Sequence, residues 1–160
     1  MKLRTLYLVF SLLICLSALQ AKTLTGKVVE IKDGDTFVVL SGRNTEKIRL
    51  EGIDCPEKKQ AFGEKARQFC SAQVFGKQVK VEYKSKDRYQ RILGTVFYGN
   101  GKNLNQDLLR AGLAWHYKHY NNDPYLAKLE IQARKQRKGL WVDKKTIPPW
   151  EFRRQKRSKG

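Results

Sequence analysis

The segment VVEIKDGDTFVVL, residues 28–40, carries the pattern from which the fold can be predicted. Residues 28–31 and 36–40 are rich in valine and other β-prone side chains. They flank Asp33-Gly34, a dipeptide typical of tight turns. Two β-prone runs joined by such a turn predict an antiparallel hairpin. A second turn signal at residues 41–44 leads the chain toward a further strand.

Three more β-prone runs follow the hairpin. Ile48 and Leu50 flank Arg49, so the arginine is expected on the opposite face from the two apolar side chains. Residues 79–83 alternate in the same way, and residues 92–98 form the last β-prone run. With the hairpin, these runs predict five short strands.

Helical spacing indicates three helices. Phe62, Ala66, Phe69 and Cys70 recur at that spacing and predict a helix over residues 61–73. The caps of the other two helices are found in the sequence: Asn103 with Gln106 before a short helix through Arg110, and Asp123-Pro124 before a helix that ends at Gly139. The prediction is an α+β domain whose strands form a small, closed or nearly closed antiparallel barrel, since closure hides the sheet edges.

The N-terminus is typical of a secretory signal peptide. Lys2 and Arg4 precede an apolar run at residues 6–16, and small residues lead to Ala21. The apolar run is short for a membrane span. We therefore interpret residues 1–21 as a signal peptide, with an uncleaved N-terminal anchor as the alternative. The mature protein is expected to be secreted or periplasmic, without stable membrane insertion.

The charge balance favours a polyanionic partner. The chain has 33 Lys and Arg against 15 Asp and Glu, a formal charge of +18. Nucleic acid is the commonest partner of such a surface, and an anionic membrane is the rival. Residues 144–160 are rich in proline and basic residues, and we expect a mostly flexible tail that adds affinity for phosphate or only solubility.

Three motifs carry the chemistry. They are DGDT at residues 33–36, IRLEGIDCPE at 48–57 and DRYQR at 87–91. Each is common alone, but in this order they resemble the thermonuclease family, the staphylococcal-nuclease-like domains. The resemblance runs from Thr25 to Trp141, inside a predicted domain of residues 22–143. It implies an OB-type five-stranded barrel with three helices and a calcium-dependent nuclease that acts on DNA and RNA, for which we expect a monomer.

The resemblance also implies roles for individual residues. Asp35, Asp54 and the backbone carbonyl of Cys55 would bind Ca²⁺, a hard cation that prefers oxygen ligands. Glu57 would act as the general base on water. The phosphate-binding arginines would be Arg49 and Arg91, because guanidinium groups bind phosphate oxygens in pairs and stay charged. Nucleotide contacts are implied for three further residues: Arg88, Tyr89 and Tyr117.

Two cysteines remain after removal of the signal peptide, which contains Cys15. An even number in an exported chain favours a Cys55–Cys70 disulfide.

Other interpretations remain open at this stage. His116 and His119 could belong to a zinc or nickel site, although no third ligand of matching type lies nearby in the sequence. A non-catalytic nucleic-acid-binding OB-fold protein would share the fold. A cationic membrane-active protein would share the charge, but it would not need the acids of the first two motifs.

The signal-peptide interpretation predicts a mature protein that begins near Lys22. Cleavage after Ala21 removes Lys2 and Arg4 and no acid, which lowers the formal charge from +18 to +16. Intact mass spectrometry of protein from the native host measures this directly. A mass that still includes residues 1–21 would show that the segment is retained as an anchor.

Overall fold

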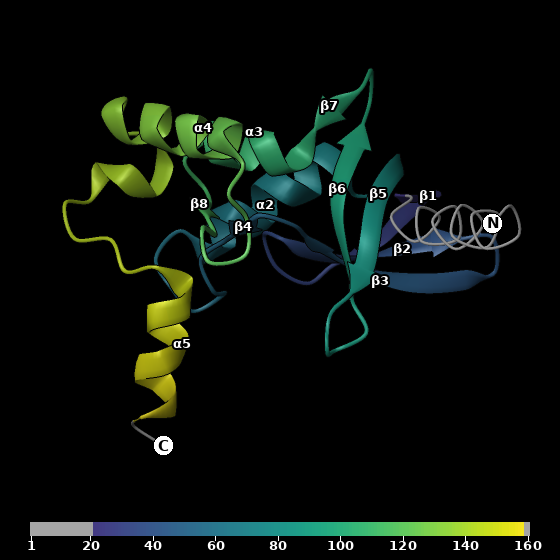
Figure 1. Cartoon of the computed structure of the whole chain (residues 1–160), viewed down its shortest axis with the longest axis horizontal. Coiled ribbons are helices and arrows are strands. Elements are labelled where there is room, and N and C mark those ends of the chain that lie inside the picture. The colour runs from purple at the N-terminus through teal and green to yellow at the C-terminus, as the bar shows by residue number, and fades with distance from the viewer. Residues whose placement is uncertain (1–20, 159–160) are drawn as a thin grey trace, which may run out of the picture.

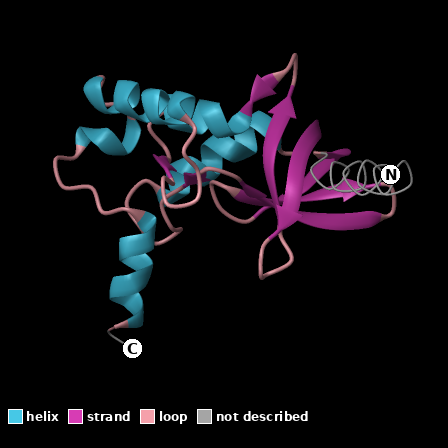
Figure 2. Cartoon of the chain, in the orientation of Figure 1, coloured by secondary structure: helices cyan, strands magenta, loops and turns pink. Residues whose placement is uncertain are grey.

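The computed structural model describes residues 21–158 of the chain. Residues 1–20, nearly all of the predicted signal peptide, lie outside this described part. Between residues 21 and 158 no helix combines the length and apolarity that a membrane crossing needs. The longer strands gather in one half of the molecule and the helices in the other, where two short strands lie among them (Figures 1 and 2).

Five strands form a closed barrel. Antiparallel pairs join neighbours in the order β3-β2-β1-β5-β6, and β3 closes the ring against β6 in parallel. An odd ring cannot alternate direction all the way round, so one parallel pair is required. The expected α+β, OB-type architecture is confirmed. The barrel was expected to be antiparallel, and the β3–β6 pair differs from that expectation. The strands are β1 (Lys22–Ile31), β2 (Thr36–Ser41), β3 (Asn44–Leu50), β5 (Gln78–Lys86) and β6 (Ile92–Tyr98).

The predicted hairpin sets the register of the barrel. Val28 pairs with Val39 across β1 and β2, and Phe37 pairs with Ile48 across β2 and β3. These side chains are buried in the main core. The first strand begins at Lys22, earlier than expected, because residues 22–27 pair with β5.

The three expected helices are present near their predicted positions. They are α2 (Gly63–Val74), α3 (Leu104–Arg110) and α4 (Pro124–Lys135). The Asn103 side chain accepts a hydrogen bond from the Gln106 N–H, and the Asp123 side chain accepts one from the Tyr125 N–H, as the capping signals predicted. Shorter elements were not predicted: β4 (Ile53–Asp54), β7 (Lys102–Asn103), β8 (Trp115–His116) and the 3-10 helix η2 (Gly139–Val142).

The C-terminal segment differs from the expected flexible tail. Residues Pro149–Arg157 form helix α5, which projects from the helical half of the molecule (Figure 1). Pro149 is the first residue of this helix, a position where the fixed φ and missing N–H of proline are favourable. Trp150 packs against a small second core made by Trp115, Ala133, Leu140 and Trp141. Helix start signals and an aromatic anchor therefore outweigh the basic composition.

The predicted Cys55–Cys70 disulfide was wrong for this structure, because both cysteines are free. Cys55 lies in the loop after β4 and Cys70 on the buried face of α2, and both belong to the main core. Burial raises the pKa of both thiols, with a further contribution from Asp35. The two residues pack as small hydrophobic side chains in their protonated form.

Gly34 in the first turn lets the turn touch the core. A Cβ placed on Gly34 would lie 2.7 Å from the Ala66 Cβ and 3.0 Å from the Cys55 Cβ, closer than real methyl groups approach. Any larger residue would therefore push the turn away from α2 and from the loop after β4.

We predict that Gly34→Ala destabilises the protein by about 1–3 kcal/mol, the usual cost of overpacking a core. Urea unfolding of the variant measures this cost. Ala66→Gly removes the nearest methyl group, so the double variant should lose less stability than the sum of the two single variants. Full additivity, or an unchanged midpoint for Gly34→Ala, would contradict the contact.

Candidate active site

Two buried carboxylates share one guanidinium at the end of the barrel. Arg49 Nη1 lies 3.0 Å from Asp35 Oδ2, and Arg49 Nη2 lies 2.6 Å from Asp54 Oδ1. Asp35 is 5% exposed and Asp54 is 1% exposed. Arg49 Nη1 also donates to the carbonyls of Leu50 and Ile53, each at 3.0 Å. Four contacts therefore fix the position of the Arg49 guanidinium.

Backbone pairing brings these residues together. Thr36 pairs with Arg49 across β2 and β3, and the Leu50 N–H donates to the Asp35 carbonyl at 2.9 Å. The chain then turns through Gly52, whose φ of 75° favours glycine. It runs into β4, where Asp54 pairs with Trp115 of β8. The small β4–β8 sheet thus holds the second aspartate against the end of β3.

The Asp35 side chain is further fixed by the loop after β4. The Cys55 N–H donates to Asp35 Oδ2 at 2.6 Å, and the Thr36 hydroxyl donates to Asp35 Oδ1 at 3.2 Å. Cys55 therefore contacts Asp35 through its backbone N–H. The role predicted for its backbone carbonyl, as a ligand of Ca²⁺, stays a prediction.

The site holds an excess of negative charge. Burial, and then the nearby Asp35 carboxylate, raises the pKa of Asp33 to about 7. Burial and Asp35 also raise the pKa of Asp54, against the opposing effect of Arg153 and Arg49. Burial alone would lower the pKa of Arg49, but Asp35 and Asp54 outweigh it and raise that pKa. Carboxylates that resist ionisation next to one another form a favourable environment for an added cation.

Glu57 lies at the edge of this cluster. Its backbone N–H donates to Gln60 Oε1 at 3.1 Å, and its side chain is 38% exposed. Glu57 Oε1 accepts a hydrogen bond from Arg153 Nη1 at 2.6 Å. Arg153 Nη2 also lies 2.8 Å from Asp54 Oδ2. One guanidinium from helix α5 therefore bridges Asp54 and Glu57.

Sequence reasoning missed Arg153 and its neighbour Trp150. The Trp150 ring stacks on Tyr117 with centroids 5.1 Å apart and planes 14° from parallel. The available signal was the stretch PPWEFRR at residues 148–154, a proline-initiated helix start with an aromatic residue inside a basic tail. It indicates a docked helix, but its docking site depends on contacts distant in the sequence.

The DRYQR motif forms a separate cationic group. Arg91 donates from its backbone and from Nε to the two carboxylate oxygens of Asp87, at 3.0 and 2.8 Å. Arg88 and Arg91 both lie over the ring of Tyr89, 4.8 and 5.4 Å from its centroid. Tyr89 is 63% exposed. This group therefore offers an aromatic face and two guanidinium groups to solvent.

Barrel closure connects this cationic group with the acids. Ile48 pairs with Ile92 in the parallel β3–β6 contact, so Arg91 stands at the same end of the barrel as Arg49. Among the residues from 21 to 158, Arg91 makes no ion pair with Asp35, Asp54 or Glu57. The structure therefore brings Asp35, Arg49, Asp54 and Glu57 into one contact network, and it leaves Arg91 at the margin.

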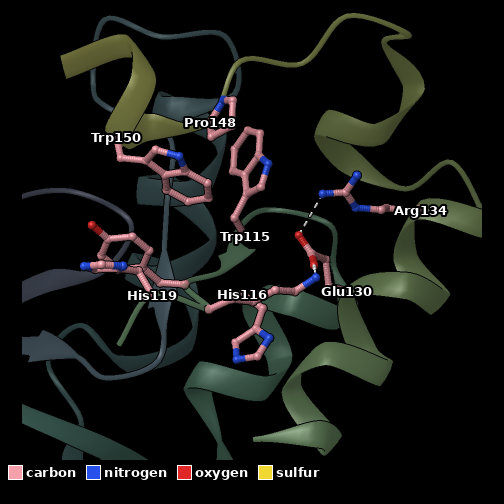
Figure 3. A pocket seen from close by; sticks show the side chains of 9 residues that line it. Trp115, His116, His119, Glu130, Arg134, Pro148 and Trp150 are labelled. Atoms are coloured by element: carbon pink, nitrogen blue, oxygen red, sulfur yellow. Dashed lines mark hydrogen bonds and ion pairs between the residues drawn. The ribbon is translucent and has the colours of Figure 1, made fainter. Parts of the chain in front are cut away.

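Tyr117 lies beside a pocket of about 370 Å³ between β8, α4 and the C-terminal segment. Figure 3 shows Trp115 of β8 and Trp150 of α5 at this pocket, with the Arg134–Glu130 ion pair on its α4 side. His116 is 3% exposed, and its Nε2 lies 3.1 Å from Asn121 Oδ1. His119 packs edge-on against Tyr120. Each histidine thus has one contact within the protein, while the buried His116 Nδ1 has no hydrogen-bond partner in the described part of the chain.

Asp35 and Asp54, the carboxylates on either side of Arg49, offer oxygen ligands of the kind that a hard cation prefers. In the described part of the chain, no group of three or more His, Cys, Asp or Glu side chains is arranged to hold a metal ion. Asp35 and Asp54 nevertheless present two buried carboxylates that share a single guanidinium. Ca²⁺ takes six to eight oxygen ligands and accepts water among them, so these two carboxylates are ligands of the kind that the ion prefers and would form only part of its ligand set.

Comparisons with known proteins show which family the chain belongs to. The family model described as "Staphylococcal nuclease homologue" matches residues 47–143. An "Uncharacterized endonuclease" of Escherichia coli is 47% identical over 131 residues, 82% of this chain and 86% of that protein. A "Micrococcal nuclease" of Shigella flexneri is 42% identical over 139 residues, 81% of this chain and 80% of that protein. The chain belongs to the staphylococcal nuclease homologue family.

Proposed function

We propose that this protein is an exported, calcium-dependent nuclease that hydrolyses phosphodiester bonds of DNA and RNA. The observation that carries the proposal is the network in which Arg49 joins the buried Asp35 and Asp54. Relatives named as nucleases support the reaction class. Export rests on the sequence of residues 1–21, and the substrate class rests on the family and the formal charge of +18.

The arginines would bind the phosphodiester. Arg49 lies between Asp35 and Asp54, and these two carboxylates stabilise its charge. Arg91 stands at the same end of the barrel, where its guanidinium would exchange Asp87 for a phosphate oxygen. Charge develops on the phosphate oxygens as the bond to the attacking water forms. The two guanidinium groups would stabilise that charge.

Glu57 would accept the proton of the attacking water. It is the one carboxylate of the network that is substantially exposed, so a water molecule can reach it. Asp35 and Asp54 are buried and would instead hold the cation. A bound calcium ion would supply positive charge for the phosphate and orient water.

The metal assignment predicts that cleavage needs calcium and both aspartates. Asp35→Asn and Asp54→Asn keep the side-chain shape but remove a charge, so calcium affinity and DNA cleavage should fall together. Asp123→Asn, at a helix N-cap where asparagine serves equally well, is the matched control and should keep both. Digestion with calcium or chelator, with calcium titration calorimetry, measures the effect. Full cleavage in chelator would refute the calcium mechanism.

The base assignment predicts that binding and rate separate at Glu57. Glu57→Gln should keep much of the calcium affinity and lose about two to four decades of single-turnover rate, the usual contribution of a general base. Glu51→Gln changes an exposed acid of the same segment and should leave the rate intact. Unaltered cleavage by Glu57→Gln would remove Glu57 from this role. Tight DNA binding without cleavage by the unmodified protein would favour the non-catalytic alternative.

A further inference from the structure

Helix α5 is docked onto the acid cluster by three contacts. Arg153 bridges Asp54 and Glu57, and the Trp150 ring lies flat on Tyr117. The Gln60 side chain donates a hydrogen bond to the backbone carbonyl of Ile147, just before the helix. All three contacts converge on the segment that carries Asp54 and Glu57 or on the aromatic residue beside it.

The oxygens of Asp54 are fully engaged in this arrangement. Arg49 Nη2 lies 2.6 Å from Oδ1, and Arg153 Nη2 lies 2.8 Å from Oδ2. Arg153 Nη1 reaches both Asp54 Oδ1, at 3.4 Å, and Glu57 Oε1, at 2.6 Å. A divalent cation that binds Asp54 would need one of these oxygens. Its charge would repel the guanidinium group that now contacts that oxygen.

Arg49 and Arg153 differ in how easily they can yield. The Arg49 side chain is 12% exposed and is also bound to two backbone carbonyls within the barrel. The Arg153 side chain is 39% exposed and stands on a terminal helix of nine residues. When Arg153 leaves Asp54, its guanidinium charge moves from a partly exposed position into solvent. If Arg49 left Asp54, its guanidinium charge would stay buried with one partner fewer.

We infer that Arg153 is a positioning residue that competes with the divalent cation for Asp54, so that cation binding and α5 docking oppose each other. The inference rests on the proposed metal site. In the cation-free protein, Arg153 holds Asp54 and Glu57 in place and offsets one of their two negative charges. When a cation binds Asp54, the guanidinium is displaced and Glu57 is released toward water. Because coupling between two binding events is reciprocal, whatever weakens α5 docking must strengthen cation binding.

The inference predicts that Arg153→Gln binds calcium more tightly than the unmodified protein, on the order of tenfold, a usual scale for coupling between linked sites. Arg154→Gln is the matched control. It removes the same charge from the next residue of the same helix, but Arg154 is exposed and makes no ion pair within residues 21–158. Arg153→Lys keeps the charge without the two-pronged contact and should fall between the two. Calorimetric titration of metal-stripped, full-length protein with calcium measures all four affinities.

A second readout follows the helix itself. Hydrogen exchange of residues 149–157 should become faster when calcium is added to the unmodified protein. In Arg153→Gln the exchange should already be fast and should not respond. Exchange in Asp35→Asn should respond only at higher calcium concentration. Thermal unfolding of each variant verifies that the barrel remains folded.

The outcomes distinguish this inference from the proposed function. Equal calcium affinity for the unmodified protein, Arg153→Gln and Arg154→Gln would overturn the competition and leave the metal site intact. An equal gain in both glutamine variants would assign the effect to overall charge and would also overturn it. Slower exchange of α5 with calcium would show that the cation strengthens docking, the opposite of the inference. An unmodified protein that binds no calcium would overturn the metal assignment and the competition with it.

Discussion

The contact of Arg49 with Asp35 and Asp54 is the interaction on which the site depends. Two carboxylates that are almost fully buried repel each other, and desolvation disfavours the charge of both. A guanidinium between them offsets part of that cost, and its loss would leave Asp35 without a cationic partner in the interior and Asp54 with Arg153 alone. The backbone around the site is consistent with this need, because the carbonyls of Leu50 and Ile53 orient the guanidinium.

The barrel supplies the rigidity that such a contact requires. Asp35 follows the β1–β2 turn, Arg49 lies on β3, and Asp54 lies on β4, so three segments must meet within a few ångströms. The β2–β3 register fixes the first two, and the β4–β8 pair fixes the third. Because β3 also closes the ring against β6, a shift at Arg49 would break the barrel itself. A site on closed strands is held more precisely than one on free loops.

Local signals in the sequence predicted local structure well. The Asp33-Gly34 turn, the alternation around Arg49 and the helix cap at Asn103 each depend on neighbours within a few residues. Motif order also predicted that Asp35, Asp54 and Glu57 would gather. The disulfide and the flexible tail were wrong for a common reason: cysteine number and charge density describe composition, whereas pairing and docking depend on contacts distant along the chain. Arg153 lies 99 residues from Asp54, so no local pattern could connect them.

The charge of the site gives a physical reason why the proposed nuclease would need a metal in spite of its cationic surface. A formal charge of +18 favours the approach of a polyanion to the surface, but in the proposed reaction the phosphodiester would have to approach three carboxylates. With Arg49 and Arg153 in place, Asp35, Asp54 and Glu57 retain one net negative charge, which opposes a phosphate. Exchange of the Arg153 guanidinium for a divalent cation removes that charge. The cluster then becomes neutral at the point where an anionic phosphate must bind. In the proposed function, attraction of nucleic acid to the protein surface and binding of the phosphodiester at the site are thus separate requirements. Only the second would depend on what occupies Asp54.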